Sequence, residues 1–473
     1  MNTSITLSGN LNQPQSIVAQ FFKYVIPAIS SLVIMALYQL VDALYIGHSG
    51  EPYALTTFNI VYPTVALYVA LAMLISVGAA SHISILMGRQ DVKGANSLFN
   101  ASVAILVVIA MLFTAVGLAF SEPLSRMLGA SDATLPYVKG YFRTVVAFSS
   151  VHMFAFMLST FARNDNAPRL SMYGMIVGGI INIILDYFFV IEFRWGTKGA
   201  AIASGIGQMF AVGIIISHFI RRRGLLRFAL PRLDARQLLM VLKLVVVAGL
   251  PAFVLEVDVG IETLLYNFAL LRNVGELGVA AYAIVGNIGF LILMVFMGIG
   301  QGIQPIISYS YGQKNLQAIA KTYFMAIGFS LGLCAVLYTG ILIFGRSVVS
   351  LFDAQNVTLV EMATNGIKVF ALAFFVSGVN ISTISLFQST GQSNVSNPIS
   401  IPRTLVFVTL GSVFLPHFFG INGIWATLLF AELMTFVVAA YFMVRTGTLK
   451  RLLLALRSRR KAPVLEADTS IIS

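Results

Sequence analysis

Four polar residues within long apolar stretches are the first candidates for chemistry: Asp42, Asn182, Asp186 and Ser204. An acid facing hydrocarbon costs roughly 2.5–3.5 kcal/mol on insertion scales, so such acids usually face the interior of a helix bundle. Asn182 and Asp186 are four residues apart and therefore share one helix face. Oxygen atoms of this kind can exchange a proton or hold a hard cation such as Na⁺.

The depth of these side chains brings them into one layer. Each lies five residues from the same predicted helix edge: Asp42 before Gly47, Asp186 before Ile191, and Ser204 after Gly199. At about 1.5 Å per residue, all three lie roughly 7–8 Å inside that edge. Tyr38 shares a helix face with Asp42. Two carboxylates in one apolar pocket cannot both be ionised at low cost, so we predict a proton-coupling or Na⁺ site there.

The elements that position these residues are predicted to be membrane-spanning helices. The chain is 58% hydrophobic and 10% charged, and its mean hydropathy is +0.89, which excludes an ordinary soluble domain. Apolar runs of about 20 residues recur along it and predict an all-α polytopic protein. We predict twelve spans, at residues 24–47, 54–86, 96–120, 136–160, 168–191, 199–220, 246–270, 278–309, 322–344, 366–389, 400–418 and 422–444. No cleavable signal peptide is expected, and the single Cys334 is interpreted as a packing residue.

The net charge of +12 is explained by topology and needs no nucleic-acid partner. If the N-terminus is cytoplasmic, 22 of the 30 basic residues fall on the cytoplasmic side. They include Arg163, Arg403, the segment 221–243 and the C-terminal tail. The positive-inside rule then predicts that both termini are cytoplasmic. The segment 221–237 is expected to connect two halves, in one interpretation as an amphipathic helix on the membrane surface.

The two halves repeat one pattern. A shift of 224 residues aligns Pro27 with Pro251, Gly78 with Gly302 and Gly88 with Gly312, without gaps. We predict lobes of six helices at 1–220 and 243–445, a basic linker at 221–242 and a cytoplasmic tail at 446–473. Because each half has an even number of spans, the lobes are related by a pseudo-twofold axis along the membrane normal. Rocking of such lobes gives alternating access to the cleft between them.

Further acids occur in the predicted seventh and twelfth spans. Asp258 and Glu262 share a helix face, whereas Glu256 points elsewhere. Like charges on one face need a cation, a proton or water. These three acids are therefore candidates for a substrate site or second cation site, and interhelical hydrogen bonding is the open alternative. Glu432 aligns with Gln208 at a shift of 224, which favours a polar packing role in both halves.

A proline lies near the start of both the first and the seventh predicted span. Because proline has no N–H group, it leaves one backbone carbonyl of each helix without its hydrogen-bond donor. Pro27 precedes Asp42 on the same predicted helix, and Pro251 is its counterpart in the second half. Two interpretations of the bend at Pro27 stay open. In one, the first span changes its bend and so moves Asp42 relative to Asp186; in the other, the bend is fixed.

The motifs "VDALYIG", "NIILDYFF", "GTKGAAIAS" and "GIGQGIQPIISYSYG" resemble those of multidrug and toxic compound extrusion (MATE) transporters, most closely the DinF-like bacterial branch. The resemblance implies export of cationic and lipophilic compounds by antiport with H⁺ or Na⁺, without a cofactor, across the bacterial inner membrane. It implies that Asp42, Asn182, Asp186 and Ser204 form the coupling site, with Ser204 replacing the commoner threonine, and that Pro27 is the kink residue. The NorM-like branch uses acids in spans 7 and 10, but span 10 has none here.

Three rival functions are weighed against a monomeric antiporter. A lipid-linked oligosaccharide flippase has a related architecture but is expected to carry a strongly cationic cleft, whereas these spans carry acids. An intramembrane enzyme is disfavoured because no HExxH cluster or other metal-ligand motif, and no nucleophile–base pair, is recognised. A channel is disfavoured because duplicated halves with unmatched charges fit a carrier better than a pore.

Overall fold

The computed structural model describes residues 16–230, 234–351 and 356–457, and these residues form helices joined by short turns. The first half contains α1 (Ile17–Gly47), α2 (Ala54–Gly88), α3 (Val92–Ala119), α4 (Ser121–Met127), α5 (Leu135–Asn164), α6 (Pro168–Asp186), the π-helix η1 (Tyr187–Glu192) and α7 (Gly196–Ile220). The second half contains α8 (Ala235–Asn273), α9 (Glu276–Gly312), α10 (Leu316–Ser350), α11 (Val357–Phe370), α12 (Ala373–Ser389), α13 (Ser393–Pro402), the π-helix η2 (Arg403–Val408), α14 (Thr409–Phe419), α15 (Ile421–Trp425), α16 (Thr427–Arg445) and α17 (Thr448–Arg457).

The number of membrane-spanning elements agrees with the prediction. Within the described residues, 11 helices are long and apolar enough to cross a membrane, and α11 with α12, bent by 41°, would make a twelfth. The fold is therefore an all-helical multi-pass architecture, as predicted. Local sequence explains several helix starts, since Asp91 and Asn315 each accept a hydrogen bond from the backbone three residues ahead.

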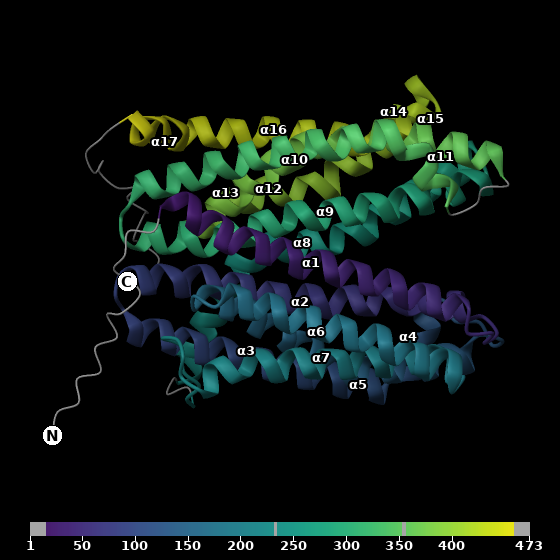
Figure 1. The fold of residues 1–473 in the computed structure, drawn as a ribbon, viewed down its shortest axis with the longest axis horizontal. Helices are drawn as coiled ribbons and strands as arrows, with labels where there is room; N and C mark the ends of the chain where they lie inside the picture. The colour runs from purple at the N-terminus through teal and green to yellow at the C-terminus, as the bar shows by residue number, and fades with distance from the viewer. Residues whose placement is uncertain (1–15, 231–233, 352–355, 458–473) are drawn as a thin grey trace.

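The helices form two bundles that lie side by side (Figure 1). Helices α1 to α7 form the N-terminal bundle, and α8 to α17 form the C-terminal bundle. The bundles meet where α1 packs on α9 and α2 packs on α8. Because α1 also packs on α6, the helix that carries Asp42 contacts both bundles.

Glycines related by the internal repeat make this interface close-packed. A Cβ atom on Gly88 would lie 3.0 Å from the Cα atom of Gly312, and one on Gly312 would lie 2.9 Å from that of Gly88. Two further contacts are equivalent under the same shift of 224: Gly78 against Gly249, and Gly302 against Val25. The repeat-related residues therefore meet as a pseudo-twofold axis requires.

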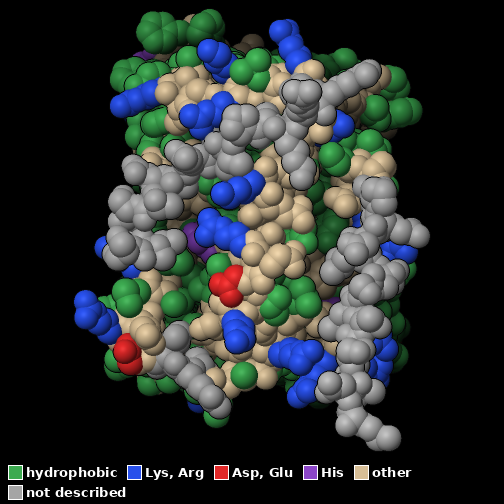
Figure 2. Space-filling view, turned by 90° about the vertical axis from the view of Figure 1, so that its left-hand side faces the viewer, with side chains coloured by type: hydrophobic (Ala, Val, Ile, Leu, Met, Phe, Trp, Pro, Cys, Tyr) green, Lys and Arg blue, Asp and Glu red, His purple; other side chains and the backbone are tan. Residues whose placement is uncertain are grey.

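One end of the molecule is rich in exposed Lys and Arg side chains (Figure 2). We call it the basic end, and it is where α1 begins, α2 and α9 end, and the segment 221–230 packs on the N-terminal bundle. Its exposed basic residues include Arg89, Lys93, Arg221 and Lys314. The other end of the spans is called the far end.

The prediction of an amphipathic helix in the linker is wrong for its described part. Residues 221–230 contain no helix, and α8 begins at Ala235, inside the range assigned to the linker. Side chains of the first bundle hold the linker backbone instead. Asp165 accepts from the N–H of Leu225 at 2.8 Å, and Asn96 accepts from the N–H of Arg227 at 2.7 Å. These bonds replace the ones that a helix would make internally.

Candidate functional site

Close approach of α6 and α7 places the first cluster of polar side chains. Gly178 and Gly207 face each other, and a Cβ atom on Gly207 would lie 2.5 Å from the Gly178 carbonyl oxygen and 3.0 Å from the Asn182 Cβ. Only glycine allows two helix backbones to come so close. This approach brings Asn182 on α6 within hydrogen-bond distance of Ser204 on α7.

A hydrogen-bonded chain joins the four predicted residues across three helices. The Ser204 hydroxyl donates to Asp42 Oδ2 at 2.8 Å, while Asn182 Nδ2 donates to Ser204 Oγ at 3.1 Å and to Asp186 Oδ2 at 3.2 Å. Asp42 is 8% exposed and Asp186 is fully buried. The structure thus brings together side chains that are up to 162 residues apart in sequence.

The cluster, which we call the acid site, has spare capacity for a positive ion. Asp42 Oδ1, Asp186 Oδ1 and Asn182 Oδ1 are buried without a hydrogen-bond donor. Asn182 and Ser204 link the two carboxyl groups, because Asn182 donates to Asp186 and to Ser204, and Ser204 donates to Asp42. Two buried carboxylates with only neutral donors repel each other, so the cluster favours a bound proton or cation. Groups of three or more His, Cys, Asp or Glu side chains suited to a metal are absent from the described residues.

A cavity inside the N-terminal bundle opens onto the acid site. Asp42 and Ser204 form part of its wall. The remaining lining is mainly aromatic or apolar: Met35, Tyr38, Gln39, Phe58, Tyr62, Val65, Tyr68, Val69, Tyr141, Val145, Phe148, His152, Phe156, Met175, Ala201 and Gln208. Aromatic faces attract organic cations, so this cavity can hold a cationic ligand beside the carboxyl groups.

Tyr38 and Pro27 lie on the helix that carries Asp42. The Tyr38 hydroxyl accepts a hydrogen bond from Gln208 Nε2 at 3.1 Å, which ties α1 to α7 next to the acid site. Pro27 lies inside the continuous helix α1, and the hydroxyl of Ser31 donates to the Pro27 carbonyl oxygen at 2.8 Å.

Two of the acids in the C-terminal bundle share one arginine as their counter-ion. Arg403, 3% exposed, donates to Glu432 Oε1 from Nε at 2.9 Å and from Nη2 at 2.8 Å, and it also forms an ion pair with Asp258. Asn380 and Ser377 donate further hydrogen bonds to the Glu432 carboxylate. Arg403 was expected at a cytoplasmic span end, and this placement is wrong because the acids of α8 and α16 draw it into the bundle.

Glu256 and Glu262 do not join the acid site. Glu262 is 9% exposed on α8, on the same face as Asp258, as the spacing predicted. Glu256 is half-buried beside Leu255, which lines a cavity between the bundles.

Sequence reasoning missed several residues that shape these sites. Gln208 was aligned with Glu432 but not connected to Tyr38, and Gly178 and Gly207 were not singled out. A glycine on each of two neighbouring spans was the available signal for the close α6–α7 contact. The partners of Arg403 come from helices far apart in sequence, so no local spacing could indicate them.

The MatE family model matches residues 27–188 and 261–413. The chain belongs to the MatE family. The matched ranges include Asp42, Asn182, Asp186 and Arg403. The multidrug export protein MepA of Staphylococcus aureus (strain bovine RF122 / ET3-1) is 25% identical over 411 residues, which cover 86% of this chain and 89% of that protein. MepA of Staphylococcus saprophyticus is 25% identical over 425 residues, which cover 89% of this chain and 92% of that protein.

A solved structure of the same architecture agrees with this assignment. The crystal structure of a MATE protein in complex with MaL6 has a TM-score of 0.86 and 21% identity, and covers 92% of this chain and 98% of its own. Similarity at this level of identity establishes the fold. The MatE fold of this chain is therefore the two-bundle arrangement described above.

Proposed function

We propose that this MatE family protein is a multidrug efflux antiporter that exports cationic and lipophilic compounds in exchange for H⁺ or Na⁺. The observation that carries the proposal is the acid site: two buried carboxyl groups linked through Asn182 and Ser204, with three buried oxygens that lack donors. The site needs no cofactor to bind a positive ion. Its position on the wall of an aromatic cavity supports competition between the coupling ion and a cationic substrate.

Residue roles follow from the hydrogen bonds. Asp42 and Asp186 bind the coupling ion, and Asn182 and Ser204 hold their carboxyl groups in place. Tyr38 lines the cavity and, through Gln208, fixes α1 against α7. Since α1 contacts both bundles, occupation of Asp42 is coupled to the packing between them.

Orientation and setting are part of the same proposal. The basic end would face the cytoplasm, with both termini there, because Lys and Arg concentrate on the cytoplasmic side of membrane proteins (Figure 2). The protein would reside in a bacterial cell membrane as a monomer, with membrane lipid around it and no nucleic-acid partner. The lobes at 1–220 and 243–445 would rock about the linker to open each end in turn.

Reconstitution into liposomes tests the coupling. A pH gradient or a Na⁺ gradient, each imposed alone, is expected to drive accumulation of a fluorescent organic cation by the wild-type protein. Asp42→Asn keeps the size of the side chain but removes its charge, so gradient-driven transport is expected to fall to the level of empty liposomes.

The control is Asp132→Asn, because Asp132 is exposed near the far end and remote from the acid site. It should transport like the wild type. Gradient-driven export by Asp42→Asn at the wild-type rate, in protein that elutes as a folded species, would exclude Asp42 from coupling.

A further inference from the structure

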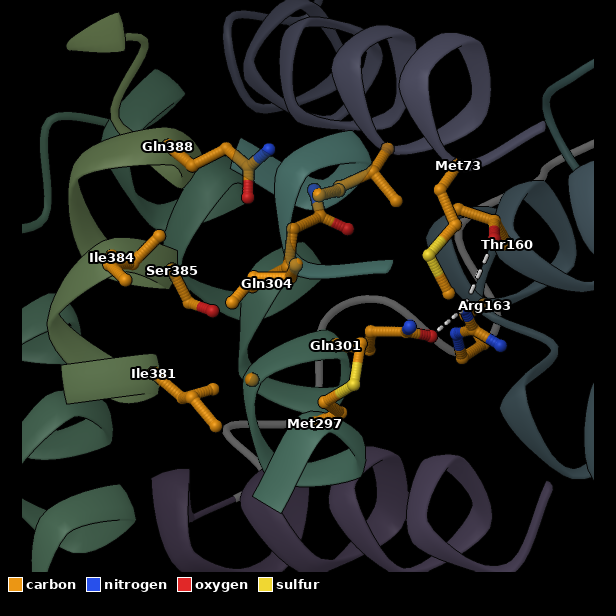
Figure 3. Close-up of a pocket in the computed structure, with 14 residues that line it drawn as sticks. Met73, Thr160, Arg163, Met297, Gln301, Gln304, Ile381, Ile384, Ser385 and Gln388 are labelled. Atoms are coloured by element: carbon orange, nitrogen blue, oxygen red, sulfur yellow. Dashed lines mark hydrogen bonds between the residues drawn. The ribbon is translucent and has the colours of Figure 1, made fainter. Parts of the chain in front are cut away.

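A second cavity lies between the two bundles (Figure 3). It is in the half of the molecule nearer the basic end, because Arg163 and Gln388 lie close to the ends of α5 and α12 there. Helices α2 and α5 of the N-terminal bundle and α8, α9 and α12 of the C-terminal bundle supply its walls. Fourteen residues line it, and they include Met73, Arg163, Met297, Gln301, Gln304 and Ser385. Arg163 is the one charged residue among them, so this cavity differs in polarity from the acid site.

Arg163 is buried without a negative partner. It is 3% exposed, and all its hydrogen bonds go to neutral oxygens. Nη1 donates to Ser159 Oγ at 3.0 Å, and Nη2 donates to Thr160 Oγ1 at 3.1 Å and to Gln301 Oε1 at 2.8 Å. Among the described residues, no carboxylate lies within 4.0 Å of its guanidinium group. Arg403 is equally buried, but it has two acid partners, whereas Arg163 has none in the described part of the chain.

Burial of an arginine without an anion is costly, and neutral hydrogen bonds offset only part of that cost. A planar guanidinium group binds carboxylates through paired, charge-assisted hydrogen bonds. The bond from Arg163 to Gln301 crosses between α5 and α9, that is, between the bundles. When the bundles part at the basic end, Nη2 loses this acceptor and can donate to an anion in its place.

The opposite wall adds polar groups and an adaptable apolar surface. The side chains of Gln304, Ser385 and Gln388 lie across the cavity from Arg163, and Met73 and Met297 lie between them (Figure 3). Methionine side chains adapt to ligands of varied shape. The lining provides one positive charge, which matches a single carboxylate and falls short of the several cations that a pyrophosphate group would need.

We propose that Arg163 and Gln301 form an anion subsite that binds the carboxylate of amphipathic substrates. This inference rests on the proposed function and assigns to Arg163 the recognition of the substrate carboxylate. The substrate carboxylate replaces the Gln301 oxygen on Arg163 when the cavity opens at the basic end. A role for Arg163 only in closing the basic end would require its hydrogen bond and not its charge.

The test uses two dyes that differ by one charge: a rhodamine ethyl ester, which is a cation, and the corresponding free acid, which is a zwitterion. Binding to purified protein in detergent is measured by fluorescence polarisation, without any ion gradient. Arg163→Gln is expected to weaken binding of the acid by about tenfold or more and to leave the ester within about twofold, since a charge-assisted hydrogen bond is lost only for the acid. Arg169→Gln is the matched control, because Arg169 is exposed at the same end, and both affinities should be unchanged.

A second variant keeps Arg163 and tests the same point if Arg163→Gln does not fold. Gln301→Glu places a protein carboxylate against Arg163 and should remove the preference for the acid while preserving ester binding. Equal loss of both dyes in Arg163→Gln, or unchanged binding of the acid in Gln301→Glu, would overturn the anion subsite. Asp42→Asn separates the two proposals. It should abolish gradient-driven transport but keep the binding difference between the dyes.

Discussion

Individual side chains show that the two bundles bury their acids in different ways. In the C-terminal bundle, Asp258 and Glu432 share Arg403 as a counter-ion, and Glu432 accepts further hydrogen bonds from neutral groups. In the N-terminal bundle, Asp42 and Asp186 have only neutral donors. A carboxyl pair that lacks an internal cation has affinity for an external one, whereas acids that share an arginine already have a counter-ion. We therefore expect ion exchange in the first bundle and a structural role for Arg403 in the second.

A stability measurement follows from this contrast. Glu432→Gln removes the carboxylate that accepts two hydrogen bonds from Arg403, and breaking a buried ion pair costs about 3–5 kcal/mol. Asp258→Asn should lower the free energy of unfolding by less, because Arg403 keeps its ion pair with Glu432. Cys334 is 2% exposed, so the temperature at which it reacts with a thiol-specific dye reports unfolding. We expect the midpoint temperature of this unfolding reaction to fall further for Glu432→Gln than for Asp258→Asn.

The control for this measurement is Glu361→Gln, since Glu361 is exposed on α11. Its midpoint should match that of the wild type. If Glu432→Gln instead melts at the wild-type temperature but loses ion-dependent transport, the assignment of a structural role to this ion pair is wrong.

Among the helices, the contact between α6 and α7 determines the geometry of the acid site. Gly207→Ala would place a methyl group 2.5 Å from the Gly178 carbonyl oxygen and 3.0 Å from Asn182 Cβ, so the helices must separate. The hydrogen bond from Asn182 to Ser204 would then lengthen or break. Overpacking of this kind costs about 1–3 kcal/mol. We expect the initial rate of gradient-driven dye transport to fall at least fivefold.

Gly213→Ala provides a matched control on the same helix. No heavy atom lies within 4 Å of a Cβ atom built on Gly213, so this substitution should leave transport unchanged. Comparable rates for Gly207→Ala and Gly213→Ala would show that close packing of α6 on α7 is not needed for the site.

The helices also show how far sequence reasoning reaches. Apolar runs predicted the spans because a membrane imposes a minimum length on each helix. Helix spacing and depth brought Asp42, Asn182, Asp186 and Ser204 into one layer, and the described hydrogen bonds confirm that they lie together. Their role in coupling remains a prediction. Depth alone could not reveal the acid–arginine pairs, because packing between distant helices selects those partners.

The whole molecule is closed toward the basic end. Gly88 packs on Gly312, Gly302 packs on Val25, and the hydrogen bond from Arg163 to Gln301 joins the bundles in the same half. We call these contacts the seal. Alternating access requires the seal to open while the far end closes, and the free energies of the closed-seal and open-seal states must differ by only a few kcal/mol. Glycines at the seal permit tight closure but contribute no side chains that would resist separation.

Enlarging one glycine should shift this equilibrium. A Cβ atom on Gly312 would collide with the carbonyl oxygen of Ile85, so Gly312→Leu destabilises the closed seal. An overpacking cost of about 1–3 kcal/mol corresponds to a population shift of about 5- to 150-fold. Ser385 lines the cavity behind the seal, and a Ser385→Cys reporter can be placed there after Cys334→Ala removes the native thiol. A bulky polar maleimide should label this reporter correspondingly faster in Gly312→Leu.

Gly328→Leu distinguishes a specific seal from a general effect of adding leucine to a helix. Gly328 is exposed on α10, and no heavy atom lies within 4 Å of a Cβ atom built there, so its labelling rate should equal that of the parent protein. Labelling must be measured in sealed vesicles of known orientation, because only access from the basic end should increase. Slower labelling in Gly312→Leu, or equal acceleration from both ends, would contradict a gate formed by the repeat-related glycines and would place the moving contact elsewhere in the interface.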